Sequence, residues 1–505
     1  MSVILGIAGA SRNAALALCE NGRVVGVCEQ ERVTRTRREP LRRGQLPRET
    51  LKETLLLGGR SEQDISAFAA AEAAIQLPPA CPVEYVDHHY AHAATAFYTS
   101  PYREATILVC DRHGMPELTV WRGDERGIRP AEFPWIGPAF ASIYGQAAEA
   151  LGFAREGDEH RLEALAHVGE RRCNLALPTI TYRDNHLDVP RQFQACVAGL
   201  LAKHSSGPLE AHRASIAEQV QRLLGSVLLQ VVEEIKSRFG DRHLCLGGGL
   251  FYNSYFNTLL AESGLYDDTF VPANPGNAGV ALGAALIVAG KEGQLARDGA
   301  LSPFLGPEYS PVEIKATLDN CKLSYDYLHN GRLLERTTAA LAKGQLVGWF
   351  QGRMEWGARA LGHRSILANP VAPYVLENLN VFMKQREPHR SYSVAICAED
   401  LPRYFRGPSK SAFMEYEYDV LDPDLLRGLM PGNATRLRVQ TVDESAGAFH
   451  SLIRAFGELT GVPMLVNTSF NGFNEPIVCN PRDAIRVFYG TGLDMAVLDS
   501  LVLQK

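Results

Sequence analysis

Residues 3–28 read VILGIAGASRNAALALCENGRVVGVC, in which short apolar runs alternate with residues that form turns. The runs at 3–8, 14–18 and 23–28 have the length and apolar character of buried strands. The Asn-Gly pair at 21–22 predicts a tight hairpin between the last two runs, because both residues adopt the positive φ that such a turn needs. The chain therefore opens on closely spaced strands, which favours an α/β fold.

Strands and helices continue to alternate along the rest of the chain. We expect strands at 105–110, 243–246, 346–350 and 463–466, and helices at 216–239, 278–289, 333–343 and 446–460. Three prolines and two glycines interrupt this alternation in GALSPFLGPEYSP at 299–311. Such a break is typical of a domain boundary, so the sequence predicts one domain at 1–305 and a second at 306–505, with mixed sheets.

Composition narrows the class of protein. The 505 residues exceed what one hydrophobic core usually serves, and the net charge of −6 gives no general footprint for nucleic acid, which we do not expect as a partner. The ten cysteines are scattered from Cys19 to Cys479 without a CxxC pair, which favours a reduced, cytoplasmic chain. The start lacks a basic leader and no apolar run reaches the length of a membrane span, so we expect no membrane partner.

A histidine-rich string, DHHYAHA at 87–93, is the strongest local signal for a metal. On a helix, His88 and His92 stand four residues apart on one face, close enough to hold one cation. Asp111 follows a strand at its carboxyl end, where α/β sheets commonly place functional side chains. Two histidines and a carboxylate suit Fe(II), Mn(II) or Zn(II), and a polar helix start with solvated histidines is the alternative.

Basic residues gather in the second half of the chain. They stand in GARALGHRS (Arg359, His363, Arg364), KQREPHR (Lys384, Arg386, Arg390) and RLRVQT (Arg438), with Asn467 in VNTSFN. Guanidinium groups that converge on a pocket would bind a phosphate or carbamate, because Arg donates in a rigid fork. A solvated basic face is the alternative reading.

A glycine turn in LCLGGGLFYNSYFN follows the strand expected at 243–246. Gly247, Gly248 and Gly249 would let the backbone approach a nucleotide closely, with Asn253 nearby. The string matches neither the Rossmann nor the P-loop pattern, and glycine can be required in such a turn for packing alone.

Nine strings, in order, resemble the NodU/CmcH carbamoyltransferase family, which modifies antibiotics and nodulation factors. They are EQERVTR (29–35), DHHYAHA (87–93), EGDEHRLEALA (156–166), GGGLFYN (247–253), NAGVALGAAL (277–286), WGARALGHRSIL (356–367), KQREPHR (384–390), RVQTV (438–442) and NTSFNGFNEPIV (467–478). The resemblance implies an actin/hexokinase-type (ASKHA) N-terminal domain, like the tRNA threonylcarbamoyl-transferase subunit, fused to a YrdC-like α/β C-terminal domain.

The same resemblance implies the chemistry. Carbamoyl phosphate would release phosphate at the C-terminal site, and the carbamate would react with ATP to give carbamoyl-adenylate and pyrophosphate. The N-terminal metal site, with Fe(II) favoured over Mn(II) and Zn(II), would then pass the carbamoyl group to a hydroxyl of a small secondary metabolite. Because carbamate and its adenylate are labile in water, we expect a fixed interface between the domains with a closed passage.

Roles follow position by position from the resemblance. His88, His92 and Asp111 match the metal ligands, with Asn277 as a weaker fourth, and Lys384 and Arg390 join the first three as catalytic residues. The residues expected to bind ATP and carbamoyl phosphate are Gly247, Gly248, Gly249, Asn253, Asn277, Arg37, Arg359, Arg364, Arg438 and Asn467.

The chain also departs from the family pattern. DGxGE is replaced by Asp111-Arg112-His113-Gly114, and Asn277 stands where the family has an Asp ligand. An amide oxygen brings no charge, so we expect weaker or altered metal binding. In addition, EGKxMGLA is replaced by EHRLEALA at 159–166.

Other functions remain open at this stage. A threonylcarbamoyl-type tRNA enzyme is disfavoured by the acidic balance, and a kinase on the same core would not need the basic C-terminal domain. A binding protein that lost the metal is the non-enzymatic alternative. The sequence leaves the acceptor, O- versus N-carbamoylation and a homodimer undecided.

Overall fold

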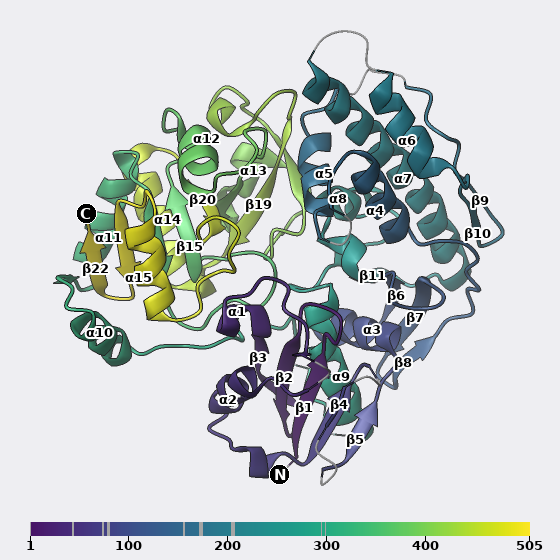
Figure 1. The fold of residues 1–505 in the computed structure, drawn as a ribbon, viewed down its shortest axis with the longest axis horizontal. Coiled ribbons are helices and arrows are strands. Elements are labelled where there is room, and N and C mark those ends of the chain that lie inside the picture. The colour runs from purple at the N-terminus through teal and green to yellow at the C-terminus, as the bar shows by residue number, and fades with distance from the viewer. Residues whose placement is uncertain are drawn as a thin grey trace.

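The computed structural model describes residues 2–505 except 43–44, 73–74, 78–80, 155–156, 171–174, 204–207, 294 and 298. The string expected at 156–166 therefore begins one residue outside the described part. In Figure 1 the C-terminal residues, green to yellow, lie beside both the N-terminal sheet and the helices of the central region. No helix in the described ranges is long and apolar enough to cross a membrane.

The first sheet has five strands in the order β3-β2-β1-β4-β5. Their bounds are β1 Val3–Ala8, β2 Ala15–Glu20, β3 Arg23–Glu29, β4 Ala67–Ala70 and β5 Val83–Tyr85. β1, β2 and β3 form an antiparallel meander, whereas β4 pairs parallel with β1 and β5 parallel with β4. The hairpin expected at 21–22 is present, with Asn21 and Gly22 both at positive φ.

The second sheet repeats this arrangement with the order β12-β11-β6-β7-β8. Its strands are β6 Ala105–Cys110, β7 Leu118–Asp124, β8 Gly127–Pro130, β11 His243–Gly247 and β12 Asp268–Phe270. Here too the first three strands are antiparallel, and the last two continue in parallel from the first. Two sheets with one topology in tandem form the actin/hexokinase-type core, so that prediction is confirmed.

Two helices, α3 (His88–Tyr98) and α9 (Asn277–Lys291), lie packed on each other between the two sheets. They approach closely because glycine stands at the contacts: a Cβ on Gly283 would collide with the carbonyl oxygen of Ala91. Thr95 of α3 donates a hydrogen bond of 2.8 Å to the carbonyl of Gly279 on α9. The two helices are therefore held at a fixed, short separation.

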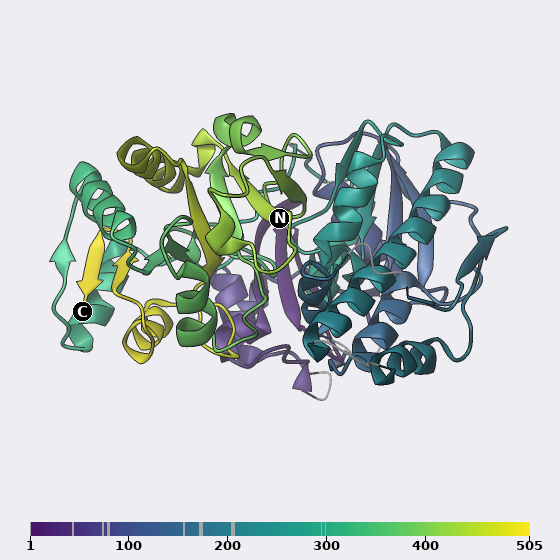
Figure 2. The same cartoon turned by 90° about the horizontal axis from the view of Figure 1, so that it is seen from above.

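The remaining N-terminal elements cover the outer faces of these sheets. They are α1 Gln30–Thr34, α2 Arg48–Leu56, α4 Phe140–Ala150, α5 Glu159–Ala166, β9 Thr181–Arg183, β10 His186–Asp188, α6 Phe193–Ala202, α7 Leu209–Phe239 and α8 Ser254–Glu262. The first two lie against β2 and β3, and the helices from α4 onward share a core with β6 and β11. Figure 2 shows the teal helices of this layer on the right and the C-terminal region, mostly green to yellow, on the left.

A mixed sheet of ten strands organises the C-terminal region, in the order β13-β22-β21-β14-β15-β20-β16-β19-β18-β17. The strands are β13 Asp326–Tyr327, β14 Val347–Phe350, β15 Arg364–Ala368, β16 Ser393–Cys397, β17 Phe405–Arg406, β18 Glu417–Val420, β19 Arg436–Val442, β20 Met464–Ser469, β21 Met495–Leu498 and β22 Leu501–Gln504. Its helices are α10 Pro311–Asn320, α11 Asn330–Ala342, α12 Val375–Glu377, α13 Leu401–Tyr404, α14 Ala448–Thr460 and α15 Pro481–Gly490. The α/β class of this region is as predicted.

The segment expected to divide the domains, 299–311, runs extended between the two regions and contacts both. Leu305 accepts a hydrogen bond of 3.0 Å from the Val27 amide of β3, and Pro303 accepts one of 2.7 Å from Trp356. All strands of the ten-stranded sheet follow this segment. The division at 305/306 itself stays a prediction.

Candidate active site

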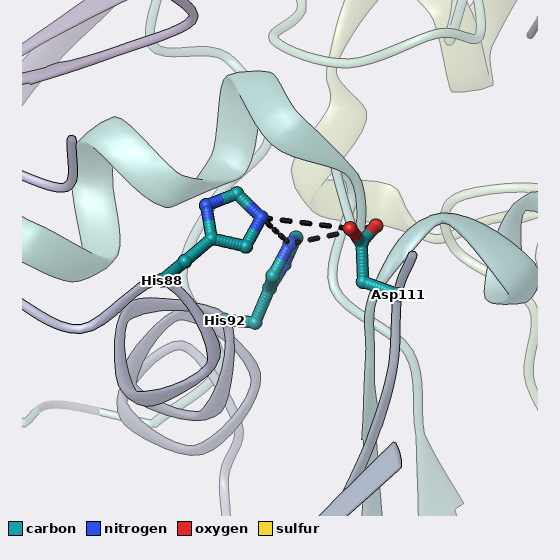
Figure 3. A group of neighbouring side chains, drawn as sticks. All are labelled: His88, His92 and Asp111. Carbon is teal, nitrogen blue, oxygen red and sulfur yellow. Dashed lines mark hydrogen bonds and ion pairs between the residues drawn. The ribbon is translucent and has the colours of Figure 1, made fainter. Parts of the chain in front are cut away.

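His88, His92 and Asp111 converge on one point, as Figure 3 shows. The two imidazole Nε2 atoms are 3.2 Å apart. Asp111 places one carboxylate oxygen 3.5 Å from His88 Nε2 and the other 3.7 Å from His92 Nε2. Three ligand atoms so arranged, two nitrogens and a carboxylate, fit a divalent transition-metal ion.

Local structure fixes each of these side chains. Asp87 caps α3 by accepting a hydrogen bond of 2.8 Å from the Tyr90 amide, so the helix begins at His88 and carries both histidines on one face. Asp111 follows the last residue of β6, and the Gly249 amide donates to its carboxylate at 3.1 Å. The triad therefore rests on regular elements rather than on loops.

Electrostatics keep these groups in the forms that bind metal. Burial, together with His88, lowers the pKa of His92 to about 3, so the ring is neutral near neutral pH. Burial raises the pKa of Asp111, but hydrogen bonds from His113 and His88 outweigh it and hold that pKa well below its usual range. A neutral imidazole beside an ionised carboxylate is the state that coordinates a cation.

One cavity of about 990 Å³ lies between the N-terminal core and the C-terminal region. Of the residues predicted from the sequence it is lined by Arg37, Asp111, Gly249, Asn253, Asn277, Arg359, Lys384, Arg390, Arg438 and Asn467. Asn277, the first residue of α9, is mostly buried in its wall. The carboxylate of the triad and the basic residues thus face the same space.

Arg359 and Arg390 indicate an anion site within this cavity. Burial lowers the pKa of Arg359 to about 9, with Arg438 and Arg390 adding to the effect. Burial and Arg386 lower the pKa of Arg390 to about 10, and its nearest carboxylate, Glu387, is 3.9 Å away. Positive charges crowded in a partly desolvated space are stabilised by a bound anion.

Other predicted anion ligands are already engaged by the protein. The Lys384 ammonium donates to the carbonyls of Ser469 and Asn471 and to the Asn471 side chain, at 2.5–2.9 Å, and so braces the 469–471 turn. Arg438 donates at 2.8 Å to Glu163 and to Ser254. Both residues line the cavity with fewer donors left for a ligand than the sequence suggests.

Arg364, predicted to belong to the anion-binding set, lies away from the cavity. Its side chain is fully buried, and its nitrogens donate to five main-chain carbonyls at 2.7–3.4 Å. The guanidinium also stacks 3.5 Å over the Phe350 ring. Arg364 holds strands and loops together and does not line the cavity.

The glycine turn packs closely against the elements that carry the triad. Gly248 has φ +102°, and a Cβ there would collide with the carbonyl of Cys110; neither it nor Gly247 lines the cavity. Their glycine character is explained by packing against β6 and α3, and their assignment to nucleotide binding stays a prediction. The Asn253 side chain caps α8 and donates to Gln221, so part of its hydrogen-bonding capacity is already used by the protein.

The family-model comparison accounts for most of the chain. A model described as carbamoyltransferase N-terminus matches residues 52–286, and one described as carbamoyltransferase C-terminus matches residues 338–505. The chain belongs to the carbamoyltransferase family. It is a transferase, and its chemistry is carbamoyl transfer.

The chain is also similar to individual proteins and to solved structures. The carbamoyltransferase is 32% identical to the uncharacterised protein sll1178 of Synechocystis sp., over 84% of this chain and 76% of the relative. It is 28% identical to the nodulation protein NolNO of Sinorhizobium fredii, over 97% of this chain and 78% of the relative. Among solved structures, full-length HypF in a phosphate- and nucleotide-bound form matches 57% of this chain and 46% of its own length, at 14% identity and a TM-score of 0.41.

His113 is a residue of this carbamoyltransferase site that sequence reasoning did not assign. Its amide and its Nδ1 both lie 2.9 Å from one Asp111 oxygen, and the ring lines the cavity. His160 and Glu163 also line it, with burial and Arg390 lowering the pKa of His160 well below its usual range. The available signal was in the family departures, because His160 and Glu163 stand where EGKxMGLA differs from the pattern. His113 occupies the unspecified position of DGxGE, next to Arg112, which replaces a glycine.

Proposed function

We propose that this carbamoyltransferase works in three steps inside the one cavity. Carbamoyl phosphate and water give carbamate and phosphate, carbamate and ATP give carbamoyl-adenylate and pyrophosphate, and a small-molecule hydroxyl takes the carbamoyl group with release of AMP. The supporting observation is that the triad carboxylate and the arginine residues line a single space. Both intermediates are labile in water, so a shared cavity preserves them.

On the basic side, Arg359 and Arg390 would bind the phosphate and carbamate groups. Among the described residues neither has a carboxylate partner within 3.5 Å. Arg359 donates to the Tyr252 carbonyl at 3.3 Å, and the other donors of these guanidinium groups would be offered to a ligand. Arg37, whose side chain donates to Asn474 at 2.8 Å, would add positive charge where ATP enters. Bidentate guanidinium contacts orient a phosphoryl or carbamoyl group without a covalent intermediate.

On the triad side, His88, His92 and Asp111 would hold the divalent ion, with Fe²⁺ favoured and Mn²⁺ or Zn²⁺ as alternatives. Asn277 would be a weaker fourth ligand, because an amide oxygen carries no charge. A bound ion supplies Lewis-acid polarisation of the carbamoyl carbonyl. Through its hydrogen bonds to Asp111, His113 fixes the direction in which the carboxylate points.

An extensive interface supports the closed passage. Contacts across it include Arg32 to the Gly357 carbonyl at 2.8 Å, Tyr416 to the Thr269 carbonyl at 2.6 Å, Arg436 to Glu262 at 3.0 Å, Arg438 to Glu163 at 2.8 Å and His167 to Glu417 at 3.0 Å. Several of these groups are buried and charged, so separating the two regions would leave them unpaired. The two regions are therefore expected to act as one rigid body during transfer.

Separating the half-reactions tests the proposal. His88→Ala should retain phosphate release from carbamoyl phosphate and lose carbamoyl transfer, whereas Arg390→Ala should lose phosphate release. Phosphate release is read colorimetrically and AMP formation by chromatography, with thermal melting as the control for folding. A folded His88→Ala protein without phosphate release would overturn the division of chemistry between the two sides.

The acceptor requires a separate search. Incubation with ATP, carbamoyl phosphate and metabolite extracts, followed by mass spectrometry, should reveal a product heavier by one carbamoyl group. A parallel incubation with bulk tRNA tests the threonylcarbamoyl-type alternative. Modification of tRNA alone would overturn the small-molecule proposal, and an absence of bound metal would favour the non-catalytic alternative.

A further inference from the structure

A second group of metal-ligating side chains lies at the other end of β16 from the cavity. Ser393 at the start of this strand lines the cavity, and Cys397 is its last residue. Glu399 follows two residues later, and His450 comes from the first turn of α14. The cysteine sulfur, a carboxylate oxygen and an imidazole nitrogen all lie within 4.8 Å of one another.

The burial of these three residues resembles that of a preorganised metal site. Cys397 is fully buried and His450 is 4% exposed, whereas the Glu399 side chain is about half exposed. His450 Nε2 already points at Glu399, with a separation of 3.1 Å from its carboxylate oxygen. Two ligands are thus fixed by packing, and the third can close on an ion from the solvent side.

Two carboxylates, Glu399 and Asp400, lie next to the buried Cys397 thiol and place negative charge on this side of the site. The nearby Arg454 is 3.6 Å from Glu458, with which it pairs. A third group of possible metal ligands consists of Glu163, His167 and Glu417. There the Arg438 guanidinium lies 2.8 Å from Glu163 and already supplies a positive charge.

We propose that Cys397, Glu399 and His450 bind one Zn²⁺ ion at a structural site separate from the catalytic triad. A thiolate, an imidazole and a carboxylate are ligands that zinc takes readily, and the exposed side leaves room for a water molecule as the fourth. Zinc binding displaces the thiol proton to solvent. The ion would tie the start of α14 to the end of β16, across which the C-terminal core packs.

Cobalt spectroscopy distinguishes this site from the catalytic one, because only this site offers sulfur. Co²⁺ is added under reducing conditions to the full chain and to His92→Ala, which lacks the triad. Both proteins should show a thiolate-to-cobalt charge-transfer band with one equivalent of Co²⁺, and Zn²⁺ should abolish it. Cys397→Ser should lose the band, whereas Cys196→Ser, a change at an exposed cysteine, should keep it.

Substitution of a buried ligand could unfold the protein, so the exposed ligand, Glu399, provides a second test. Glu399→Gln leaves the core untouched and should weaken Zn²⁺ binding at this site by about 10- to 100-fold, measured by competition with a chelating dye. Zn²⁺ should raise the melting temperature of His92→Ala but not that of His92→Ala/Glu399→Gln. A missing charge-transfer band in His92→Ala, or unchanged affinity in Glu399→Gln, would overturn the proposal.

Discussion

The two sides of the cavity are built in different ways. On the triad side, His88 and His92 stand on one face of α3, and Asp111 follows the end of β6. On the basic side, Arg359 and Arg390 lie in loops of the C-terminal region. Helix and strand ends fix a side chain through periodicity that can be counted in the sequence, whereas a loop fixes it only through tertiary contacts.

This difference also limits how far local sequence spacing predicts the position of a side chain. The spacing of the histidines already implied that they could share an ion. A basic motif, however, does not indicate whether its donors face a ligand or the protein's own carbonyls. Arg364 and Arg359 stand five residues apart. The Arg364 guanidinium donates to main-chain carbonyls, whereas Arg359 faces the cavity.

The largest expected effect comes from breaking the triad. His92→Ala should reduce carbamoyl transfer by more than about 100-fold, since even residues behind metal ligands cost up to about that factor. Elemental analysis should find a matching loss of bound metal. Arg390→Ala is the matched control on the opposite wall and should retain the metal; equal metal content in the two variants would contradict the assignment.

Within the basic side, Arg364 and Arg390 should separate stability from catalysis. Arg364→Ala should lower the free energy of unfolding by about 3 kcal/mol or more, because several buried carbonyls lose their donor. Arg390→Ala should change it by less than about 1 kcal/mol while losing phosphate release. Urea denaturation measures both values, and a stable Arg364→Ala protein with impaired phosphate release would instead support Arg364 as an anion ligand.

Acid should loosen the interface that joins the two sides. Burial raises the pKa of Glu417, but His167 and Ser254 outweigh it and lower that pKa from 4.5 to about 2. A group whose pKa is lower in the folded state stabilises above its unfolded pKa and loses that contribution as pH falls through the folded one. Between about pH 4.5 and 2 the wild type should therefore lose about 2–3 kcal/mol more than Glu417→Gln. The free energy of unfolding is measured against pH for both proteins. Identical slopes for the wild type and Glu417→Gln would contradict this prediction.

The smallest expected effect is an increase in metal affinity. Asn277→Asp restores a charge beside the triad, at the N-terminus of α9 where the helix dipole favours an anion. Burial offsets part of the Coulomb attraction, so metal affinity should rise by about tenfold. Chelator competition measures this change. Unaltered affinity would show that residue 277 lies outside the coordination sphere.

The architecture could be predicted from the sequence largely because its strands and helices carry strong local patterns. The strands at 3–8 and 105–110 have the predicted bounds, whereas the helix expected from 216 begins at Leu209, since its first residues lack the apolar periodicity of the rest. The contact between Glu163 and Arg438 could not be predicted. It joins residues 275 positions apart through the packing of two regions, and no local signal encodes such a pairing.

The close packing of α3 against α9 has a consequence for ion selectivity. In the proposed metal site the two histidines stand on α3 and Asn277 begins α9, so the separation of these helices would set the radius of the coordination sphere. That separation depends on Gly283, whose single hydrogen atom faces the Ala91 carbonyl about two helical turns from Asn277. If the triad binds an ion as proposed, the size of ion accepted would depend on this buried helix contact, through residues that do not coordinate the ion.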